Sequence, residues 1–168
     1  MADEKKGMLR HVDILGRVVI PREVRKALRI NYGDLMEFSA LSNKQVVMRK
    51  FHLINEISGL FNVVVNLARL KKDIDIIIVD TERVVCFNGE RQIPKGELGE
   101  DVLNIIRARE EKVLDKEFKI TSDFALRKES LILPIISGGD VLGGIIIDKE
   151  EKEMADLIAN FVIEYFAN

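Results

Sequence analysis

The chain has 168 residues, of which 47% are apolar and 6% aromatic, and its net charge is −2. This length fits one medium domain or two small ones, with enough apolar residues for a sizeable core. A single cysteine, Cys86, excludes an intrachain disulfide and a cysteine-based zinc site within one chain, which fits a reducing cytoplasm.

The net charge conceals an asymmetry between the two parts of the chain. Residues 1–50 hold 11 Lys and Arg against 6 Asp and Glu, a balance of +5, whereas residues 51–168 hold 15 against 22, a balance of −7. The basic part is expected to meet a polyanion, and the acidic part is not expected to touch DNA. No apolar run approaches the ~20 residues of a transmembrane helix, and the polar N-terminus lacks the core of a signal peptide.

Residues 9–28 predict a strand, a turn, a second strand and a short helix. Asp13-Ile14-Leu15-Gly16 is the turn, with a glycine where a positive φ is needed. Pro21 stands where a helix can begin, and Glu23 suits the positive end of the helix dipole. Arginine-rich stretches bind phosphates and base edges, although a solvated basic face is an equally good interpretation. The cations of this stretch are Arg10, Arg17, Arg22, Arg25, Lys26 and Arg29.

Two further strands are expected over residues 35–41 and 45–50, joined by the turn Ser42-Asn43-Lys44. The N-terminal part is then two hairpins with a helical turn between them. Some 45 residues of this kind bury too little surface to be stable alone, so dimerisation is expected. Two copies also suit a pseudo-palindromic DNA site.

Residues 7–50 resemble the AbrB-type swapped-hairpin DNA-binding domain of bacterial transition-state regulators. The resemblance implies a dimer that interleaves strands from two chains, and DNA contacts at Arg10, Arg17, Arg25 and Lys26. Arg22 and Arg29 are added from charge and helix position alone, and His11 replaces a lysine that is frequent in the family. The motif reads Asp13-x-x-Gly16-Arg17-Val18-Val19-Ile20-Pro21, Glu23-Val24-Arg25-Lys26-x-Leu28 and Gly33-Asp34-x-x-Glu37, followed by the strand 46–50.

Residues 51–72 predict one helix with a broad apolar face. This helix packs either on its own domain or on its twin in a dimer, and the seam-like spacing favours the twin. The seam consists of Leu53, Ile57, Leu60, Val64 and Leu67, widened by Ile54, Phe61 and Ala68.

Residues 73–168 predict a hairpin, a helix, a second hairpin and a last helix. The expected elements are strands 74–79 and 84–87 at the centre of a sheet, a loop 88–96, a helix 98–109, a short edge strand 117–121, strands 131–136 and 141–147, and a C-terminal amphipathic helix. With the helix before them, they describe an α+β domain with an antiparallel sheet.

This order is similar to a GAF or PAS-like sensor domain, which some AbrB-type sporulation regulators carry. The resemblance implies a dimer contact through the first and last helices of that domain. The expected organisation is an AbrB-like swapped-hairpin β-barrel dimer domain at 1–50, a linker or dimerisation helix at 51–72 and a GAF-like sensor or oligomerisation domain at 73–168.

The acidic part offers little catalytic chemistry. The two histidines, His11 and His52, lie in or beside the basic part, so none is expected to pair with Cys86. Asp73, Asp75 and Asp80 are close in sequence, but strand alternation separates their directions, so no metal site is expected. The cysteine is expected to be a small buried hydrophobe.

Two other features of this part leave alternatives open. Gly143-Gly144 marks a bulge, a close ligand approach or tight packing under a helix. A GAF fold holds ligands beneath its loops, here Asn88–Glu97 and Thr121–Lys128, but the signature of cyclic-nucleotide GAF domains is absent. An unspecified small-molecule ligand and a purely structural role therefore both remain.

These features predict a transcription regulator that binds double-stranded DNA and tolerates sequence variation. It is expected to be cytoplasmic and nucleoid-associated, a homodimer or homotetramer, without cofactor or metal, not attached to membranes and not an enzyme. The alternatives are an antitoxin that uses the same type of DNA-binding domain with a toxin-binding tail, and a GAF-type enzyme such as a sulfoxide reductase.

Overall fold

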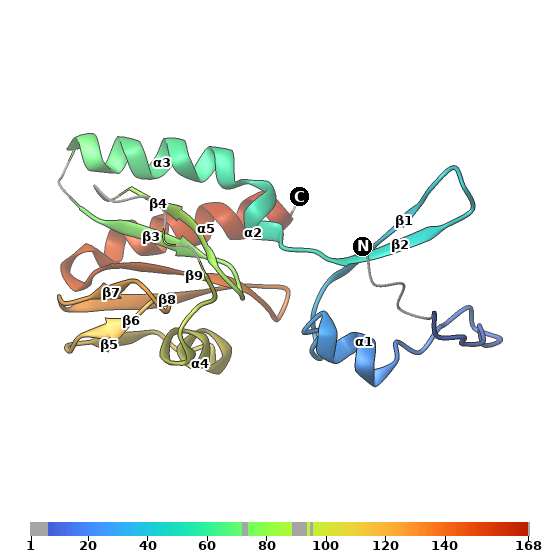
Figure 1. Ribbon diagram of the computed structural model, residues 1–168. Helices are drawn as coiled ribbons and strands as arrows, with labels where there is room; N and C mark the ends of the chain where they lie inside the picture. Colours follow the sequence, from blue (N-terminus) through green and yellow to red (C-terminus); the bar gives the residue numbers. More distant parts are fainter. Residues whose placement is uncertain (1–6, 72–73, 89–93, 95, 168) are drawn as a thin grey trace. The chain divides into compact units, whose positions relative to one another are not determined.

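The computed structural model describes residues 7–71, 74–88, 94 and 96–167. The chain divides into two compact units, Met1–Phe51 and His52–Asn168, which we call the head and the body. Figure 1 shows the elements of both units along the chain.

The head contains one helix and one β-hairpin. Helix α1 spans Arg22–Ala27 and follows Pro21, whose carbonyl accepts the N–H of Arg25 at 2.9 Å. Strands β1 (Met36–Ala40) and β2 (Val46–Lys50) pair antiparallel, as the alternation of their side chains predicted.

The turn at Asp13–Gly16 is confirmed, because Gly16 has a φ of +76° and its N–H donates to the carbonyl of Asp13 at 3.0 Å. The two strands predicted around it are absent, since residues 7–20 form no strand. The Asp13 N–H donates to the Arg17 carbonyl, but no ladder continues from this bond within the described chain, so the flanking segments lack the hydrogen-bond partners that a strand needs.

The head has no buried side chain among its described residues, 7–51. Its apolar residues are instead largely exposed: Ile14 is 102% exposed, Leu9 92% and Phe38 65%. A polypeptide unit with this surface cannot offset the entropy of ordering its chain by burial within itself. The others with large exposed fractions are Met8, Val12, Leu15, Val18, Val19, Leu28, Tyr32, Leu35, Leu41, Val46 and Val47.

The body is built on a five-stranded antiparallel sheet with the order β4-β3-β9-β8-β5. The hairpin predicted at the centre lies toward one side, because β4 is an edge strand and β9 is central. The strands are β3 (Ile76–Val79), β4 (Val84–Phe87), β5 (Lys112–Leu114), β8 (Ser130–Ser137) and β9 (Asp140–Asp148).

Both faces of this sheet are buried, which explains the continuous apolar runs of its inner strands. On β9, Ile145 and Ile147 enter one core cluster, while Ile146 enters the other. The alternation on β3 is the same, with Ile76 and Ile78 on one face.

One face of the sheet is covered by α2 (Leu53–Glu56), α3 (Ser58–Lys71) and α5 (Lys152–Ala167), the last preceded by a 3-10 turn at Lys149–Glu151. The single helix predicted over 51–72 is therefore two helices, which break at Ile57. The Ile57 carbonyl accepts the N–H groups of Leu60 and Phe61, so the second helix starts there.

The buried stripe of this helical segment differs from the predicted seam. Two seam positions, Leu60 and Leu67, are 39% and 60% exposed. The side chains that enter the core are Ile54, Ile57, Phe61, Val65 and Ala68. The segment thus packs on its own unit with one face and leaves a second apolar face uncovered in the described chain.

Helix α4 (Glu100–Ala108) covers the other face, together with a small sheet of β6 (Phe118–Lys119) and β7 (Ala125–Leu126). The edge strand predicted at 117–121 belongs to this small sheet. Strands β5 and β7 were not predicted, because two or three residues show no periodicity.

Asn88 fastens α3 to the sheet. This buried side chain donates to the carbonyls of Val65 and Ile74 at 3.0 and 2.9 Å and accepts the N–H of Ile76 at 2.7 Å. These bonds use both amide donors of Asn88 and one acceptor position of its oxygen, and they fix the helix in one register.

The glycine pair in β9 is explained by packing. A Cβ at Gly143 would lie 2.1 Å from the Val79 carbonyl oxygen, and one at Gly144 would lie 3.1 Å from the Ile106 side chain. The ladder also shifts register between Ile135 and Ile136, opposite this pair. The bulge and the tight packing are both present, and no ligand is needed to explain them.

We expect Gly143→Ala to lower the free energy of unfolding of the body by about 1–3 kcal/mol, because the new methyl group meets a backbone carbonyl that cannot move aside. Gly59→Ala is the matched control, since nothing lies within 4 Å of its Cβ position, and it should leave stability unchanged or raise it by up to about 0.5 kcal/mol. Urea unfolding measures both, and equal stabilities of the two variants would contradict this account.

Candidate nucleic-acid interface

The turn of the head is organised by Asp13. Its Oδ1 accepts the backbone N–H groups of Leu15 at 2.9 Å and Arg17 at 2.8 Å, and its Oδ2 accepts the Nε–H of Arg17 at 2.7 Å. Aspartate commonly closes turns by such bonds to the backbone that follows it. Here the same carboxylate also holds the guanidinium of the first arginine after the turn.

These bonds lower the pKa of Asp13 below its ordinary value of 3.8. The backbone N–H of Arg17 contributes most and its guanidinium next, because both stabilise the carboxylate form. Asp13 is therefore negatively charged near neutral pH.

Helix α1 displays three cations on one side. Arg22, Arg25 and Lys26 are spaced i, i+3 and i+4, which places them on neighbouring positions of the helix surface, and all three are exposed. Arg25 and Lys26 lie in the last turn, where the helix dipole favours positive charge. The Nη1 of Arg25 also donates to the carbonyl of Ile20 at 2.7 Å, so this side chain ties the helix to the preceding segment.

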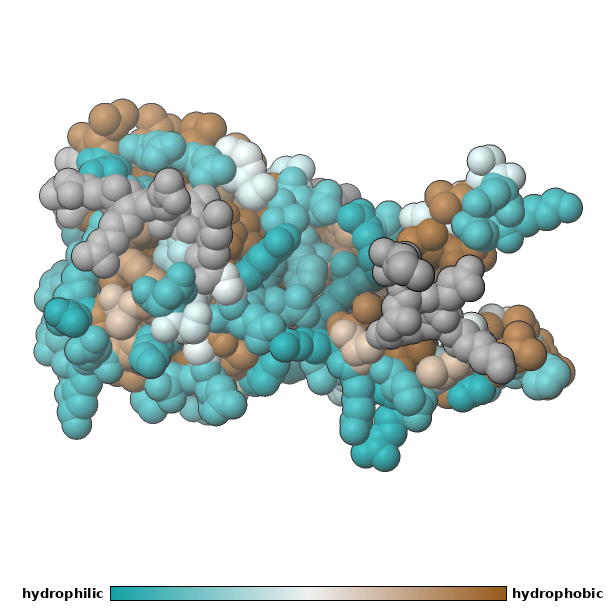
Figure 2. Space-filling model, in the orientation of Figure 1, coloured by the Kyte–Doolittle hydropathy of each residue, from teal (hydrophilic) through white to brown (hydrophobic). Residues whose placement is uncertain are grey.

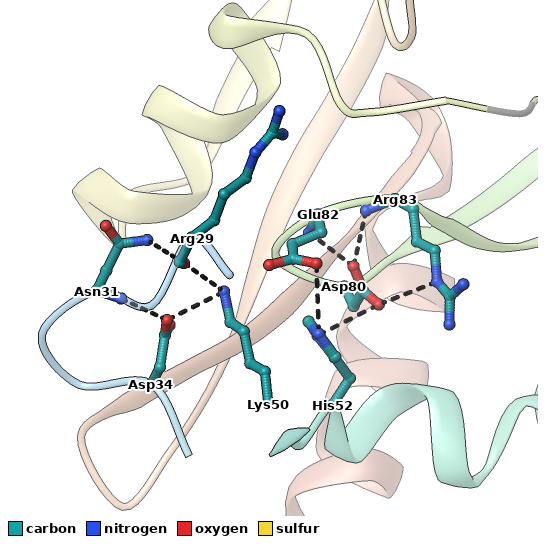
Figure 3. A network of polar contacts seen from close by, with 8 residues as sticks. All are labelled: Arg29, Asn31, Asp34, Lys50, His52, Asp80, Glu82 and Arg83. Carbon is teal, nitrogen blue, oxygen red and sulfur yellow. Dashed lines mark hydrogen bonds and ion pairs between the residues drawn. The ribbon is translucent and has the colours of Figure 1, made fainter. Parts of the chain in front are cut away.

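The end of α1 is connected to the hairpin by a polar network, shown in Figure 3. The Oδ2 of Asp34 accepts the N–H of Asn31 at 2.7 Å and pairs with the Nζ of Lys50 at 3.1 Å. The carbonyl of Arg29 accepts the Nδ2 of Asn31 at 3.1 Å, and Arg29 itself has a φ of +51°. This network fixes where α1 ends and how the chain enters β1.

All six candidate DNA-binding cations are exposed. The structure brings Arg22, Arg25 and Lys26 together on α1, places Arg17 on the turn and puts Arg29 just beyond the helix. Arg10 precedes the turn and donates from Nη1 to the Leu9 carbonyl at 2.7 Å. The contact of Asp13 with the Arg17 side chain and the Arg25–Ile20 bond were not predicted. The Asp-x-x-Gly-Arg sequence does indicate the contact of Asp13, because it places a carboxylate and an arginine on either side of a tight turn.

The acidic side chains of the head leave most of these cations unneutralised. Three of them engage cations: Asp13 pairs with Arg17, Asp34 with Lys50, and Glu37 with Arg49. No ion pair is described for Arg10, Arg22, Arg25 or Lys26 within the part of the chain that the structure covers. Exposed guanidinium and ammonium groups without a carboxylate partner suit phosphate oxygens.

Cys86 in the body is buried, as predicted, and its thiol lies 3.0 Å from the Oδ1 of Asn62. Burial raises the pKa of this thiol to about 11, so almost none of it is thiolate near neutral pH. Such a thiol is a poor nucleophile.

His52 faces two carboxylates in the body, as Figure 3 shows. Its Nδ1 lies 3.5 Å from the Oδ2 of Asp80, and its Nε2 lies 3.5 Å from the Oε2 of Glu82. Asp80 is fully buried, and its Oδ1 accepts the N–H groups of Glu82 and Arg83 at 2.7 Å. Asp80 thus stabilises the turn between β3 and β4, and His52, the first residue of the body, contacts this turn through Asp80 and Glu82.

No group of three or more metal-ligating side chains occurs among the described residues. Of the predicted ligand loops, residues 89–93 and 95 lie outside the described part, as does Asp73, which was considered as a metal ligand. Within the helices that are described, none has the length and apolar character needed to cross a membrane.

The helical face of the body carries an uncovered apolar surface, visible over α3 in Figure 2. On α3 it consists of Leu60, Val63, Leu67 and Leu70. Helix α5 also carries exposed apolar side chains, Leu157, Phe161 and Tyr165. Large exposed apolar patches of this kind are typical of protein–protein contacts.

A comparison with protein families matches residues 67–165 to the model described as stage V sporulation protein T C-terminal, transcription factor. Stage V sporulation protein T of Bacillus subtilis (strain 168) is 24% identical over 162 residues, covering 90% of this chain and 88% of that protein.

Among solved structures, residues 122 to 287 of a methyl-accepting chemotaxis protein superpose with a TM-score of 0.52 at 13% identity, covering 67% of this chain and 88% of that one. A type II free methionine-R-sulfoxide reductase from Thermoplasma acidophilum gives a TM-score of 0.47 at 15% identity, covering 66% of this chain and 93% of that one. The first likeness shows the fold alone.

We expect the carboxyl group of Asp13 to titrate below 3.8 in a pH series followed by NMR, because two groups of Arg17 stabilise its charged form. Because the folded pKa is the lower one, this contribution to stability is present above pH 3.8 and is lost as the pH falls through the folded value.

Arg17→Ala removes only the guanidinium, the second cause, and should raise the Asp13 pKa partway toward its ordinary value. Arg22→Ala, for which no contact with Asp13 is described, should leave it unchanged. An Asp13 that titrates at or above 3.8 would contradict the described turn.

Proposed function

The chain belongs to the stage V sporulation protein T C-terminal family of transcription factors, and from this premise we propose that it regulates transcription by binding double-stranded DNA through an AbrB-like head. The contacts are made by Arg10, Arg17, Arg25 and Lys26, with Arg22 and Arg29 beside them. The protein acts in the cytoplasm, on the nucleoid, and tolerates variation in the DNA sequence because phosphate contacts and DNA shape dominate its recognition.

One observation carries this proposal: the head presents six exposed cations, and no ion pair is described for four of them, Arg10, Arg22, Arg25 and Lys26, within the residues that the structure covers. Helix α1 and the 13–17 turn can both approach a phosphate backbone, and arginine forks can also bind guanine edges. The body is acidic overall, so it is repelled by the same DNA.

The second part of the proposal is that the head is dimeric. Its described residues bury no side chain, and residues 7–20 contain no strand although their sequence favours one. A second copy of the chain can pair with residues 7–20 as strands and can bury the exposed apolar side chains of the head, as in the swapped-hairpin arrangement. It also doubles the cationic surface and matches a two-fold symmetric DNA site.

The body oligomerises through α3 and α5, giving a dimer or a tetramer. Their uncovered apolar residues support this role, as does the burial of the opposite side of each helix in its own core. A GAF-like body also suits the sensing of a small molecule, although nothing in the described loops specifies its chemistry. We propose no enzymatic activity, because Cys86 is buried with a raised pKa.

The antitoxin alternative gains no support. An antitoxin of this type carries a short flexible tail, whereas residues 52–167 contain a five-stranded sheet with two core clusters. Co-purification of a small toxin would revive it.

We expect binding to mixed-sequence duplex DNA to weaken steeply with salt. About eight phosphate contacts per dimer give a slope of log affinity against log salt of roughly −7. Arg17→Ala and Lys26→Ala should each remove one contact per protomer, weaken binding and reduce the slope by about 2.

Lys116→Ala is the matched control, because Lys116 is an exposed cation of the body and should not affect DNA binding. Fluorescence anisotropy measures the affinities, while circular dichroism and mass in solution check fold and assembly. A slope near zero, or equal affinities of all variants, would refute DNA binding by the head.

We expect Leu67→Glu to lower the mass of the particle in analytical ultracentrifugation, because it places a charge within the apolar face of α3. Asn104→Glu adds the same charge at an exposed position of α4, which covers the other face of the sheet, and should leave the mass unchanged. If neither substitution alters the mass or its dependence on protein concentration, this face is not the contact between bodies.

A further inference from the structure

An acidic side chain lies within the cationic surface of the head. Asp13 is four residues from Arg17, and the two side chains are 39% and 72% exposed. A carboxylate near the phosphate backbone is repelled by it, so the presence of one here weakens DNA binding unless it also contributes something favourable.

The contacts of Asp13 divide between its two oxygens. Oδ1 accepts the backbone N–H groups of Leu15 and Arg17 and thereby shapes the turn. Oδ2 accepts only the Nε–H of the Arg17 side chain, at 2.7 Å. One carboxylate therefore fixes both the backbone and the side chain of the same arginine.

The bond through Nε leaves the most useful donors of Arg17 available. A guanidinium has five N–H donors, and the four on its Nη atoms make no bond within the described residues. Two of these four, one on each Nη, form the planar edge that can bind a phosphate or a guanine in a bidentate manner. A clamp at Nε thus orients this edge without occupying it.

We propose that Asp13 is a positioning residue for DNA binding, which holds the Arg17 guanidinium with its Nη edge directed at the DNA. This inference rests on the proposed DNA-binding function and adds a device within the same site. The benefit is preorganisation: an arginine that is already held loses less side-chain freedom when it contacts DNA. Preorganisation outweighs the repulsion between the carboxylate and the phosphates.

Removing the negative charge of Asp13 distinguishes a positioning role from simple repulsion between this carboxylate and the DNA, because the two predict opposite changes in affinity. In Asp13→Asn the amide oxygen can still accept the Leu15 and Arg17 N–H groups, so the turn is retained. Its NH₂ group then faces the Nε–H of Arg17, donor against donor, and the clamp is lost. Electrostatics alone predicts tighter binding by about twofold to fourfold, whereas loss of the clamp predicts weaker binding.

The experiment measures the affinity of the full-length chain for mixed-sequence duplex DNA at low and moderate salt. We expect Asp13→Asn to weaken binding about fivefold, since two arginines per dimer lose their fixed orientation. Glu23→Gln is the matched control: it removes the other carboxylate of the 10–29 stretch, which has no described partner, and should tighten binding about twofold to fourfold.

A double-mutant cycle with Arg17→Ala separates positioning from a merely structural role. If Asp13 acts through Arg17, Asp13→Asn no longer weakens binding in the Arg17→Ala background and instead tightens it as Glu23→Gln does. If Asp13 only stabilises the turn, Asp13→Asn weakens binding equally in both backgrounds, and the proposal is wrong. Circular dichroism and mass in solution confirm that each variant keeps its fold and assembly.

The outcomes separate this inference from the function on which it rests. A wild-type chain that does not bind DNA refutes the proposed function itself. A wild-type chain that binds, with Asp13→Asn as tight as or tighter than wild type, refutes the positioning role and leaves the function intact.

Discussion

The body depends on a sheet whose two faces are both apolar. The side chains of β9 alternate between the two core clusters, so Ile145 and Ile146 need cover on opposite sides. Helices α3 and α5 provide it on one side, and α4 with the small β6–β7 sheet provides it on the other. The close approach at Gly143, where the backbones of β3 and β9 leave no room for a side chain, belongs to the same constraint.

In the head, by contrast, the apolar side chains are not covered. Its described apolar residues lie on a unit that buries none of them, and most of its cations occupy the same short stretch of chain. Folding and DNA binding are therefore coupled in our proposal, because the second copy that covers the apolar surface also completes the cationic one. The body, which has cores of its own, can then hold two or more heads together through α3 and α5.

Two aspartates of the head, Asp13 and Asp34, each contact both the backbone and a cationic side chain. Asp34 engages the Lys50 ammonium and the Asn31 backbone, and so helps to connect α1 to the hairpin. Asp13 engages the turn and Arg17. Each of these carboxylates lowers the net positive charge by one, but each also fixes the local backbone and one cationic side chain of the head.

The sequence by itself determined the local elements: the Asp13–Gly16 turn, the β1–β2 hairpin, the buried strands β3, β8 and β9, and the amphipathic helices. Their signals are turn residues and periodicity, which act over a few neighbouring positions. The six cations of the candidate interface could also be predicted from the sequence, because the charge of an arginine or lysine does not depend on which residues it contacts.

Only the tertiary structure decided which strand is central, where the helix at 51–72 breaks, and which of its two apolar stripes enters the core. It also revealed the contacts of Asp13 and of Arg25 with their neighbours. These features depend on which distant surfaces meet, and several registers of an apolar helix or strand satisfy the same periodicity. The choice among them is made by close packing and by completed hydrogen bonds, which exist only once the chain has folded.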